Sequence, residues 1–445
     1  MKPVPFLFLF CGFNLQLNSH LTKGVFHPDN QASRIVITRA HPSDRALPAK
    51  IQDDTVFLAG LLGKYPQYFS RILQNRNYYR VQIIYTQIDR DGVNNPSFKN
   101  YYFNVNRQTY FYPASTVKMP VALLALQKLR ELGLPGLDKN SSMLTEMDYS
   151  GQTAVLNDPT TPDGRPTVGN YIKKIFLVSD NDAFNRLYEF LGQDYIHQHL
   201  QNMGCEDARI MHRLEISLTD DENRHTNPVR FFDPSGKFLY QQPMQSSQTK
   251  FSSEPDSIGK GYYQKGQLIN HAMDFSKKNR IGLEDLHRIL RSIIFPGSFQ
   301  AAQRFTLTEE DYNFVYQYMS QYPSESKYPY YDTANNWDAF GKFLFWGSEK
   351  GSLPKNIRIF NKEGDAYGFL TDLSYFTDLD RRIEFLLSAT IYCNSDGILN
   401  DDKYDYDSVG LPFMKQLGRV IYDYELRRNR AHTPNLSKFR LKYEK

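Results

Sequence analysis

The chain has 445 residues, of which 40% are hydrophobic and 23% are charged. This ordinary globular balance excludes a chain that is disordered throughout, and the length allows a sizeable core. The 53 basic and 49 acidic residues leave a net charge of +4, which is too balanced to indicate a nucleic-acid partner. The cysteines Cys11, Cys205 and Cys393 form no Cys-x-x-Cys pair, which argues against a thiol-ligated zinc site. We expect neither a metal nor a cofactor.

A short apolar run, Phe6–Phe13, follows Lys2 at the N-terminus. It is too short for a membrane span, which needs about 20 residues, but it fits the apolar part of a secretory signal peptide. We therefore predict an exported protein of the periplasm or cell envelope, with residues 1–20 as the signal peptide and 21–50 as an N-terminal extension. The alternative is a disordered or buried N-terminal strand.

Helical and alternating patterns divide the rest of the chain into elements. The first half predicts a helix, two strands and three helices, at 53–74, 79–89, 98–105, 115–132, 168–177 and 183–191. The second half predicts a hairpin, two helices, three strands and a closing helix, at 228–240, 283–294, 309–319, 356–361, 368–376, 382–393 and 411–428. Strands near both ends enclose a helical block, so we predict an α+β fold whose N-terminal and C-terminal strands pair. Pro66 should bend the first helix, and the basic stretch 427–445 should be a solvated tail.

Ser115 and Lys118 stand at the start of a strongly apolar predicted helix. Positions i and i+3 share a helical face, so the lysine can reach the serine hydroxyl. A serine hydroxyl needs an adjacent base, and burial would lower the lysine pKa toward that role. The alternative is a helix-capping serine beside a surface lysine. Four other Ser-x-x-Lys strings lie in polar or Gly/Pro-containing stretches, where solvated turns are expected, and begin at Ser247, Ser257, Ser324 and Ser352.

Two further short motifs follow in the chain. Ser179–Asn181, with the sequence Ser-Asp-Asn, lies between two predicted helices, where each of its residues would also serve as an N-cap. Lys362–Gly364, with the sequence Lys-Glu-Gly, lies in a predicted strand. A glycine there would let a ligand approach the backbone, or it would mark a bend in an edge strand.

Together, Ser115–Lys118, Ser179–Asn181 and Lys362–Gly364 resemble the S-x-x-K, S-D-N and K-T-G motifs of class A β-lactamases and penicillin-binding proteins. Arg213–Leu218 resembles this family's Arg-x-Glu-x-x-Leu loop, at the class A distance from the second motif. The resemblance covers residues 55–428. It implies a serine β-lactamase/transpeptidase-like fold, in which an antiparallel sheet of N-terminal and C-terminal strands packs with a helical subdomain.

The resemblance implies roles for four catalytic residues. Ser115 would attack a carbonyl and form an acyl-enzyme, and Lys118 would help to remove its proton. Ser179 would relay a proton to the leaving nitrogen, and Glu215 would activate the water that releases the acyl group. Whether lysine or glutamate is the acylation base is disputed for the family.

The resemblance also implies three residues that bind substrate. Asn181 would hydrogen-bond the substrate amide and steady Lys118. Lys362 would place positive charge beside Ser179 and toward a substrate carboxylate. The strand after Gly364 would supply the second N–H of the oxyanion hole.

Three features depart from the family pattern. Glu363 replaces the hydroxyl residue between lysine and glycine, and its carboxylate would repel an anionic substrate unless it points to the far side of the strand. Alternation sets it opposite Lys362, but the family's hydroxyl occupies the same position and contacts substrate. Thr219 stands where the family has an asparagine that helps to hold the deacylating water. The interval between the second and third motifs is much longer than usual. The additional residues lie near 223–278 and 328–353, and they could cover the predicted active-site cleft.

We therefore predict an exported serine hydrolase with the class A β-lactamase fold, which cleaves a β-lactam-like amide through an acyl-Ser115 intermediate. Residues 51–430 would form one discontinuous catalytic domain, and 431–445 a basic tail. The alternatives are a D-alanyl peptidase or other amidohydrolase on the same fold, and a non-catalytic protein that binds the envelope. The expected partner is a small-molecule or cell-wall peptide amide substrate. We expect no nucleic acid and no membrane span, and the chain should be a monomer.

Overall fold

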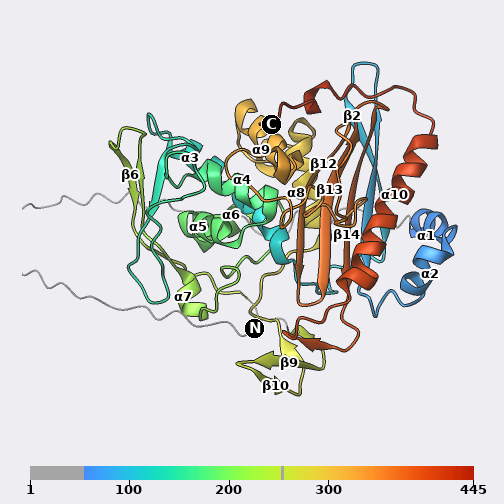
Figure 1. Ribbon diagram of the computed structural model, residues 1–445, viewed down its shortest axis with the longest axis horizontal. Helices are drawn as coiled ribbons and strands as arrows, with labels where there is room; N and C mark the ends of the chain where they lie inside the picture. Colours follow the sequence, from blue (N-terminus) through green and yellow to red (C-terminus); the bar gives the residue numbers. More distant parts are fainter. Residues whose placement is uncertain (1–54, 252–254, 445) are drawn as a thin grey trace, which may run out of the picture. The chain divides into compact units, whose positions relative to one another are not determined.

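The computed structural model describes residues 55–251 and 255–444, so the predicted signal peptide and N-terminal extension lie outside the described residues. Its main sheet has five strands in the order β12-β13-β14-β1-β2, and every neighbouring pair is antiparallel. The strands are β1 (Gln82–Arg90), β2 (Pro96–Phe103), β12 (Ile357–Ala366), β13 (Phe369–Asp378) and β14 (Ile383–Tyr392). Because β1 pairs with β14, the predicted pairing of N-terminal and C-terminal strands is confirmed (Figure 1).

Helices cover both faces of this sheet (Figure 1). On one face lie α1 (Thr55–Gly63), α2 (Pro66–Gln74) and α10 (Leu411–Arg427), and on the other lie α8 (Leu283–Ile294) and α9 (Glu309–Ser320). Both faces are buried because side chains alternate along each strand. Ile359 and Leu387 belong to the core on the first side, whereas their neighbours Phe360 and Leu386 belong to the core on the second.

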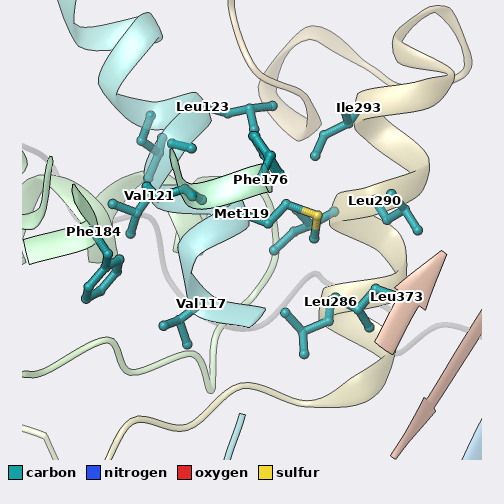
Figure 2. Close-up of a cluster of buried hydrophobic side chains, with 14 of the residues drawn as sticks. Val117, Met119, Val121, Leu123, Phe176, Phe184, Leu286, Leu290, Ile293 and Leu373 are labelled. Atoms are coloured by element: carbon teal, nitrogen blue, oxygen red, sulfur yellow. The ribbon is translucent and has the colours of Figure 1, made fainter. Parts of the chain in front are cut away.

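A helical block lies beyond α8 and α9. It contains α3 (Lys118–Leu132), α4 (Val168–Val178), α5 (Asn181–Leu191) and α6 (Gln193–Asn202). Figure 2 shows Met119 of α3 reaching toward Leu290 of α8. Leu286 of α8 and Leu373 of β13 belong to the same buried cluster. Apolar packing thus fixes the start of α3, where the first motif lies, against the sheet.

Pro66 changes the first predicted helix. Instead of bending one helix over 53–74, it separates α1 from α2 and stands at the first position of α2. The missing N–H of proline is harmless there, because the first N–H groups of a helix have no partner within the helix. The other predicted helices and strands lie within a few residues of their expected positions.

The first predicted insertion is built mainly of short strands. β5 (Val229–Phe232) and β6 (Phe238–Gln242) form the predicted hairpin, which joins β3 (Ser142–Thr145) in a small sheet. A second hairpin, β9 (Gly261–Gln264) and β10 (Gln267–Ile269), pairs with β15 after the main sheet. The insertion is therefore tied to the loop that follows β14. The remaining short elements are α7 (Asp220–Arg224), β4 (His225–Thr226), β7 (Gln245–Ser246), β8 (Ser257–Ile258), β11 (Met273–Asp274) and β15 (Ile398–Leu399).

The C-terminal segment does not form the solvated tail that its basic composition predicted. Leu436 and Phe439 are buried in the core that includes α9. Near the chain end, the Glu444 carboxylate accepts hydrogen bonds from Lys173 and Tyr318. The expectation was wrong because the apolar residues between the basic ones supply buried contacts, while the charged side chains pair or remain at the surface.

Cys205 and Cys393 are both buried and unpaired. Burial raises the pKa of the Cys205 thiol to about 12, so this thiol stays protonated near neutral pH. Within residues 55–251 and 255–444, no helix has both the length and the apolar character needed to cross a membrane. The same residues contain no group of three or more His, Cys, Asp or Glu side chains arranged to hold a metal ion.

Candidate active site

The first motif begins as a tight turn rather than as part of the long helix. Ala114–Val117 form a 3₁₀ turn, in which Ala114 has a φ of 45°, and α3 begins at Lys118. Ser115 is half-buried on this turn, whereas Lys118 is completely buried. The alternative of a surface lysine is therefore wrong, because the protein interior encloses this side chain.

The loop between α4 and α5 holds the Lys118 amine. Its Nζ donates to the backbone carbonyl of Ser179, to Ser179 Oγ at 3.2 Å and to Asn181 Oδ1 at 2.6 Å. Within the described part of the chain it makes no hydrogen bond to Ser115 Oγ, although the spacing predicted that it can reach this hydroxyl. The three acceptors of the loop compete with the serine for the amine. Catalytic hydrogen bonds often close only when substrate is bound.

The Lys118 amine lies in surroundings that disfavour its charge. Burial lowers the pKa of Lys118 well below that of a free lysine, and the positive charge of Lys362 lowers it further. A lower pKa increases the fraction of neutral amine at pH 7. Only the neutral amine can accept a proton, so the site favours the form that acts as a base.

The second motif divides its residues between helix capping and the site. Asp180 is the N-cap of α5, where its carboxylate accepts a hydrogen bond from Ala183 N at 2.7 Å. Ser179 ends α4 with a φ of 58°. Its Oγ lies 2.9 Å from Lys362 Nζ and 3.2 Å from Lys118 Nζ. Of the three motif residues, only Asp180 serves as an N-cap. The Ser179 hydroxyl instead lies between the amines of Lys118 and Lys362.

Glu363 pairs with Lys362, contrary to the expectation from strand alternation. Lys362 Nζ lies 2.8 Å from Glu363 Oε1, and both side chains are buried. Lys362 Nζ also donates to the backbone carbonyl of Glu363 at 3.0 Å, so the lysine side chain folds back along its own strand to reach its neighbour. The pairing means that Glu363 offsets the positive charge that Lys362 presents to the site.

Gly364 allows β12 to lie against the turn that carries Ser115. A Cβ at Gly364 would lie 2.6 Å from Ser115 N and 2.9 Å from both Pro113 O and Thr116 N. These distances exclude any side chain at this position unless the backbone shifts. The close approach predicted from the glycine is therefore made by the chain's own backbone, and it brings the strand and the turn together at Ser115.

Glu215 faces solvent on the loop before α7, with a φ of 63°. Its Oε2 accepts a hydrogen bond from Asn181 Nδ2 at 2.7 Å. The same asparagine bonds Lys118 through Oδ1, so it connects the two candidate bases. Asn185 of α5 fastens the loop, because its side chain exchanges two hydrogen bonds with the backbone of Leu214.

Arg213 fastens the same loop through a buried ion pair. Its Nε donates to Glu189 Oε1 at 2.8 Å, and Arg186 lies 3.1 Å from the other oxygen of that carboxylate. Arg213 also donates to the backbone carbonyls of Glu222 and His225. Burial raises the pKa of Glu189, and the two arginines counteract this shift. A buried network of Arg213, Glu189 and Arg186 therefore anchors the loop that carries Glu215.

Arg213→Met should destabilise the fold by about 3 kcal/mol, because it leaves the buried Glu189 carboxylate with one arginine instead of two. Urea unfolding monitored by circular dichroism would measure the change. The matched control is Lys277→Met, which breaks an exposed ion pair with Asp220 and should cost less than about 1 kcal/mol. Equal stability of the two variants would contradict the structural role of Arg213.

Thr219 serves as a helix cap. Its hydroxyl accepts a hydrogen bond from Glu222 N at 3.2 Å and donates to Glu222 Oε2 at 2.8 Å. In return, the Thr219 backbone N–H donates to Glu222 Oε2 at 2.8 Å, which completes a reciprocal capping box at the start of α7. The side chain of Thr219, which replaces the family's asparagine, thus makes its hydrogen bonds to the start of α7.

A pocket of about 340 Å³ opens beside Ser115. Its lining residues are Tyr112, Ala114, Ser115, Asn181, Leu214, Glu215, Asp365, Ala366, Tyr367, Asn400, Asp402 and Tyr404. Three predicted site residues line it directly, while Lys118, Ser179 and Lys362 form the hydrogen-bonded network described above. Sequence reasoning missed the segment around Asn400 and Asp402, whose one visible signal is a cluster of Asp and Tyr residues.

The sheet and the helical block agree with one known family. Residues 67–424 match the family model described as the β-lactamase enzyme family. The chain belongs to this family. The matched region contains all seven predicted site residues, from Ser115 to Gly364. The predicted fold class is confirmed: the mixed α+β structure has the serine β-lactamase/penicillin-binding-protein type of fold.

Solved structures resemble this β-lactamase-family chain at low sequence identity. A β-lactamase from Desulfarculus baarsii DSM 2075 is 13% identical, with 83% of this chain and 98% of that chain covered and a TM-score of 0.42. A β-lactamase from Xanthomonas campestris pv. campestris str. ATCC 33913 is also 13% identical, with 83% and 99% covered and a TM-score of 0.42. No curated protein matches the chain.

Proposed function

We propose that the chain is a serine hydrolase of the class A type, which cleaves a β-lactam-like amide through an acyl-Ser115 intermediate. The observation that carries the proposal is the position of Ser179 Oγ between Lys118 Nζ and Lys362 Nζ. A hydroxyl held by two amines can pass a proton toward a leaving nitrogen, which amide cleavage requires. Membership of the β-lactamase family supports a hydrolase.

In the proposed acylation, Ser115 Oγ attacks the substrate carbonyl and forms a C–O bond, while its proton passes to the neutral amine of Lys118. Backbone N–H groups of the Ser115 turn and of the strand after Gly364 would stabilise the oxyanion. The C–N bond then breaks, and the proton moves from Lys118 through Ser179 Oγ to the leaving nitrogen. The acyl group remains on Ser115 as an ester.

In the proposed deacylation, the Glu215 carboxylate takes a proton from a water molecule, which attacks the acyl carbonyl. The ester C–O bond breaks, Ser115 Oγ regains a proton, and a carboxylic acid leaves. The position of Glu215 in the pocket and its 2.7 Å hydrogen bond from Asn181 support this role. Because Thr219 caps α7, the water would rely on Glu215 and Asn181.

Incubation with a fluorescent penicillin and a chromogenic cephalosporin, followed by intact-mass spectrometry, tests the proposal. We expect a covalent adduct that maps to Ser115, followed by turnover, and neither in Ser115→Ala. An adduct without turnover would favour a D-alanyl peptidase. Absence of both adduct and turnover would exclude β-lactams as substrates.

A D-alanyl peptidase or another amidohydrolase on the same fold is the second candidate. The ion pair between Glu363 and Lys362 favours it, because a paired lysine attracts a substrate carboxylate less strongly than an unpaired one. β-Lactam recognition in the family relies on such a carboxylate. The charge of Glu363 therefore bears directly on the choice between the two candidates.

Glu363→Thr should tighten the binding of carboxylate-bearing β-lactams about tenfold, because it removes a buried negative charge beside Lys362. Glu363→Gln keeps the side-chain volume and should act in the same direction, which separates charge from shape. The concentration dependence of acylation would provide the dissociation constants. If neither variant binds more tightly, the substrate does not experience the charge of Glu363.

We also propose that the protein is exported to the periplasm or cell envelope. The apolar run after Lys2 supports export, and residues 51–430 would then form the discontinuous catalytic domain. N-terminal sequencing of the protein from fractionated cells tests this. A protein recovered from the cytoplasm with Met1 in place would contradict export.

A further inference from the structure

The pocket beside Ser115 is lined by acidic side chains. Glu215, Asp365 and Asp402 line it, and all three are exposed. Among the described residues that line it, none is lysine, arginine or histidine. Carboxylates gathered around a nucleophile create a negative potential where a substrate must enter.

The nearby lysines offset this charge only in part, because Lys362 and Lys118 act on Asp365 from outside the pocket lining. Glu363 lies 2.8 Å from Lys362, and burial favours the neutral form of Lys118. Lys278 lies outside the lining, with its Nζ 5.5 Å from the centre of the Tyr367 ring and 3.4 Å from its hydroxyl. Tyr367 is a pocket residue whose ring already has the Lys278 ammonium near it, so any substrate cation would share this ring with Lys278.

Asp365 and Asp402 have no ion-pair partner within residues 55–251 and 255–444. Although Asp365 is open to the cleft, the protein around it desolvates its carboxylate and raises its pKa, and Glu363 raises this pKa further, while the charges of Lys362 and Lys118 counteract part of the shift. A positive group beside Asp365 would relieve both effects. The pocket thus has negative charge that Lys362 and Lys118 offset only in part and that no ion pair of the described residues neutralises.

The wall that carries Asp402 is held in place by the insertion. β15 pairs with β9 of the inserted hairpin, and Asn400 Nδ2 donates to Tyr263 O at 3.1 Å. The Tyr404 hydroxyl accepts a hydrogen bond from Asn400 N at 2.9 Å. The insertion therefore positions the loop after β14 at the pocket, and the acidic wall is part of the ordered cleft.

We propose that this cleft recognises amide substrates that carry a positively charged group, such as a primary ammonium, close to the scissile bond. The ammonium would lie near Asp365 and Asp402, with the Tyr367 ring beside it. The inference rests on the proposed acyl-Ser115 function. It assigns the loop after β14, which pairs with the inserted hairpin, a role in selecting the charge of the substrate.

Benzylpenicillin and ampicillin test this inference, because they differ by one amino group that is largely protonated at pH 6. We expect the wild-type protein to be acylated roughly tenfold faster by ampicillin, and 1 M salt should reduce this ratio. Asp365→Asn and Asp402→Asn should each lower the ratio by about threefold, because each removes one exposed charge. The control is Asp407→Asn, which removes an exposed carboxylate outside the pocket and should leave the ratio unchanged.

Adducts from both penicillins at equal rates would overturn the inference and leave the acyl-Ser115 chemistry intact. If neither penicillin forms an adduct, the proposed β-lactam activity fails and equilibrium binding decides the inference. Nα-acetyl-lysine amide should then bind to the Ser115→Ala variant at least threefold more tightly than Nα-acetyl-norleucine amide, by NMR titration. Equal binding of these two amides would overturn the inference as well.

Discussion

Lys118→Met should lower the rate of acylation by about 10²–10⁴-fold, the usual contribution of a positioned general base. Methionine fills the buried site with an apolar side chain but cannot take the proton of Ser115. It also removes the donor to Asn181 Oδ1 and to Ser179. Rapid mixing with a chromogenic cephalosporin would measure the acylation rate, and thermal unfolding would show that the variant is folded.

Lys128→Met is the matched control. Lys128 lies on the same helix, burial lowers its pKa to about 8, and its amine donates to the Phe190 and Leu191 carbonyls. Its amine bonds none of the residues of the Ser179–Asn181 loop, so its removal should change the acylation rate by less than about twofold. If the acylation rate fell by a similar factor in both variants, the effect would come from replacing any buried lysine of α3 and not from the loss of a base.

The pH profile separates a base from a structural residue. Burial holds the pKa of Lys118 well below the 10.5 of a free lysine. The amine is protonated below its lowered pKa, so acylation should fall about tenfold per pH unit there and be constant above it. An unshifted lysine would instead give a rate that rises as far as pH 10. Lys118→Met should lack the inflection.

Local pattern was sufficient to predict most of the fold. β1 and β14 alternate or are continuously apolar, and their placement at opposite ends of the chain implied that they pair. The site was harder, because Ser179 and Lys362 are 183 residues apart and no local rule connects them. Only the family resemblance placed them together, and the structure brings their Oγ and Nζ to 2.9 Å.

The remaining differences depend on contacts across the fold. Alternation separates Lys362 from Glu363 on an ideal strand, but the long lysine side chain folds back to the backbone carbonyl and the carboxylate of its neighbour. Asp402 enters the pocket because a two-residue strand, β15, pairs with an inserted hairpin. So short a strand has no detectable periodicity, and its pairing could not be predicted.

Glu215→Gln should convert the enzyme into one that stops as acyl-Ser115. Glutamine has nearly the same shape and can still accept the Asn181 hydrogen bond, but it cannot take a proton from water. Acylation relies on Lys118 in the proposed mechanism, so it should continue at a similar rate. Deacylation should slow by about 10²–10⁴-fold.

A chromogenic cephalosporin would then give a burst equal to the enzyme concentration, and mass spectrometry would find the acyl-enzyme. Asp220→Asn is the control, because it removes a nearby exposed carboxylate that lies outside the pocket. Wild-type turnover by Glu215→Gln would mean that another group activates the water. A loss of the burst itself would show that Glu215 takes part in acylation. Measuring acylation and deacylation separately therefore decides whether Lys118 or Glu215 is the acylation base.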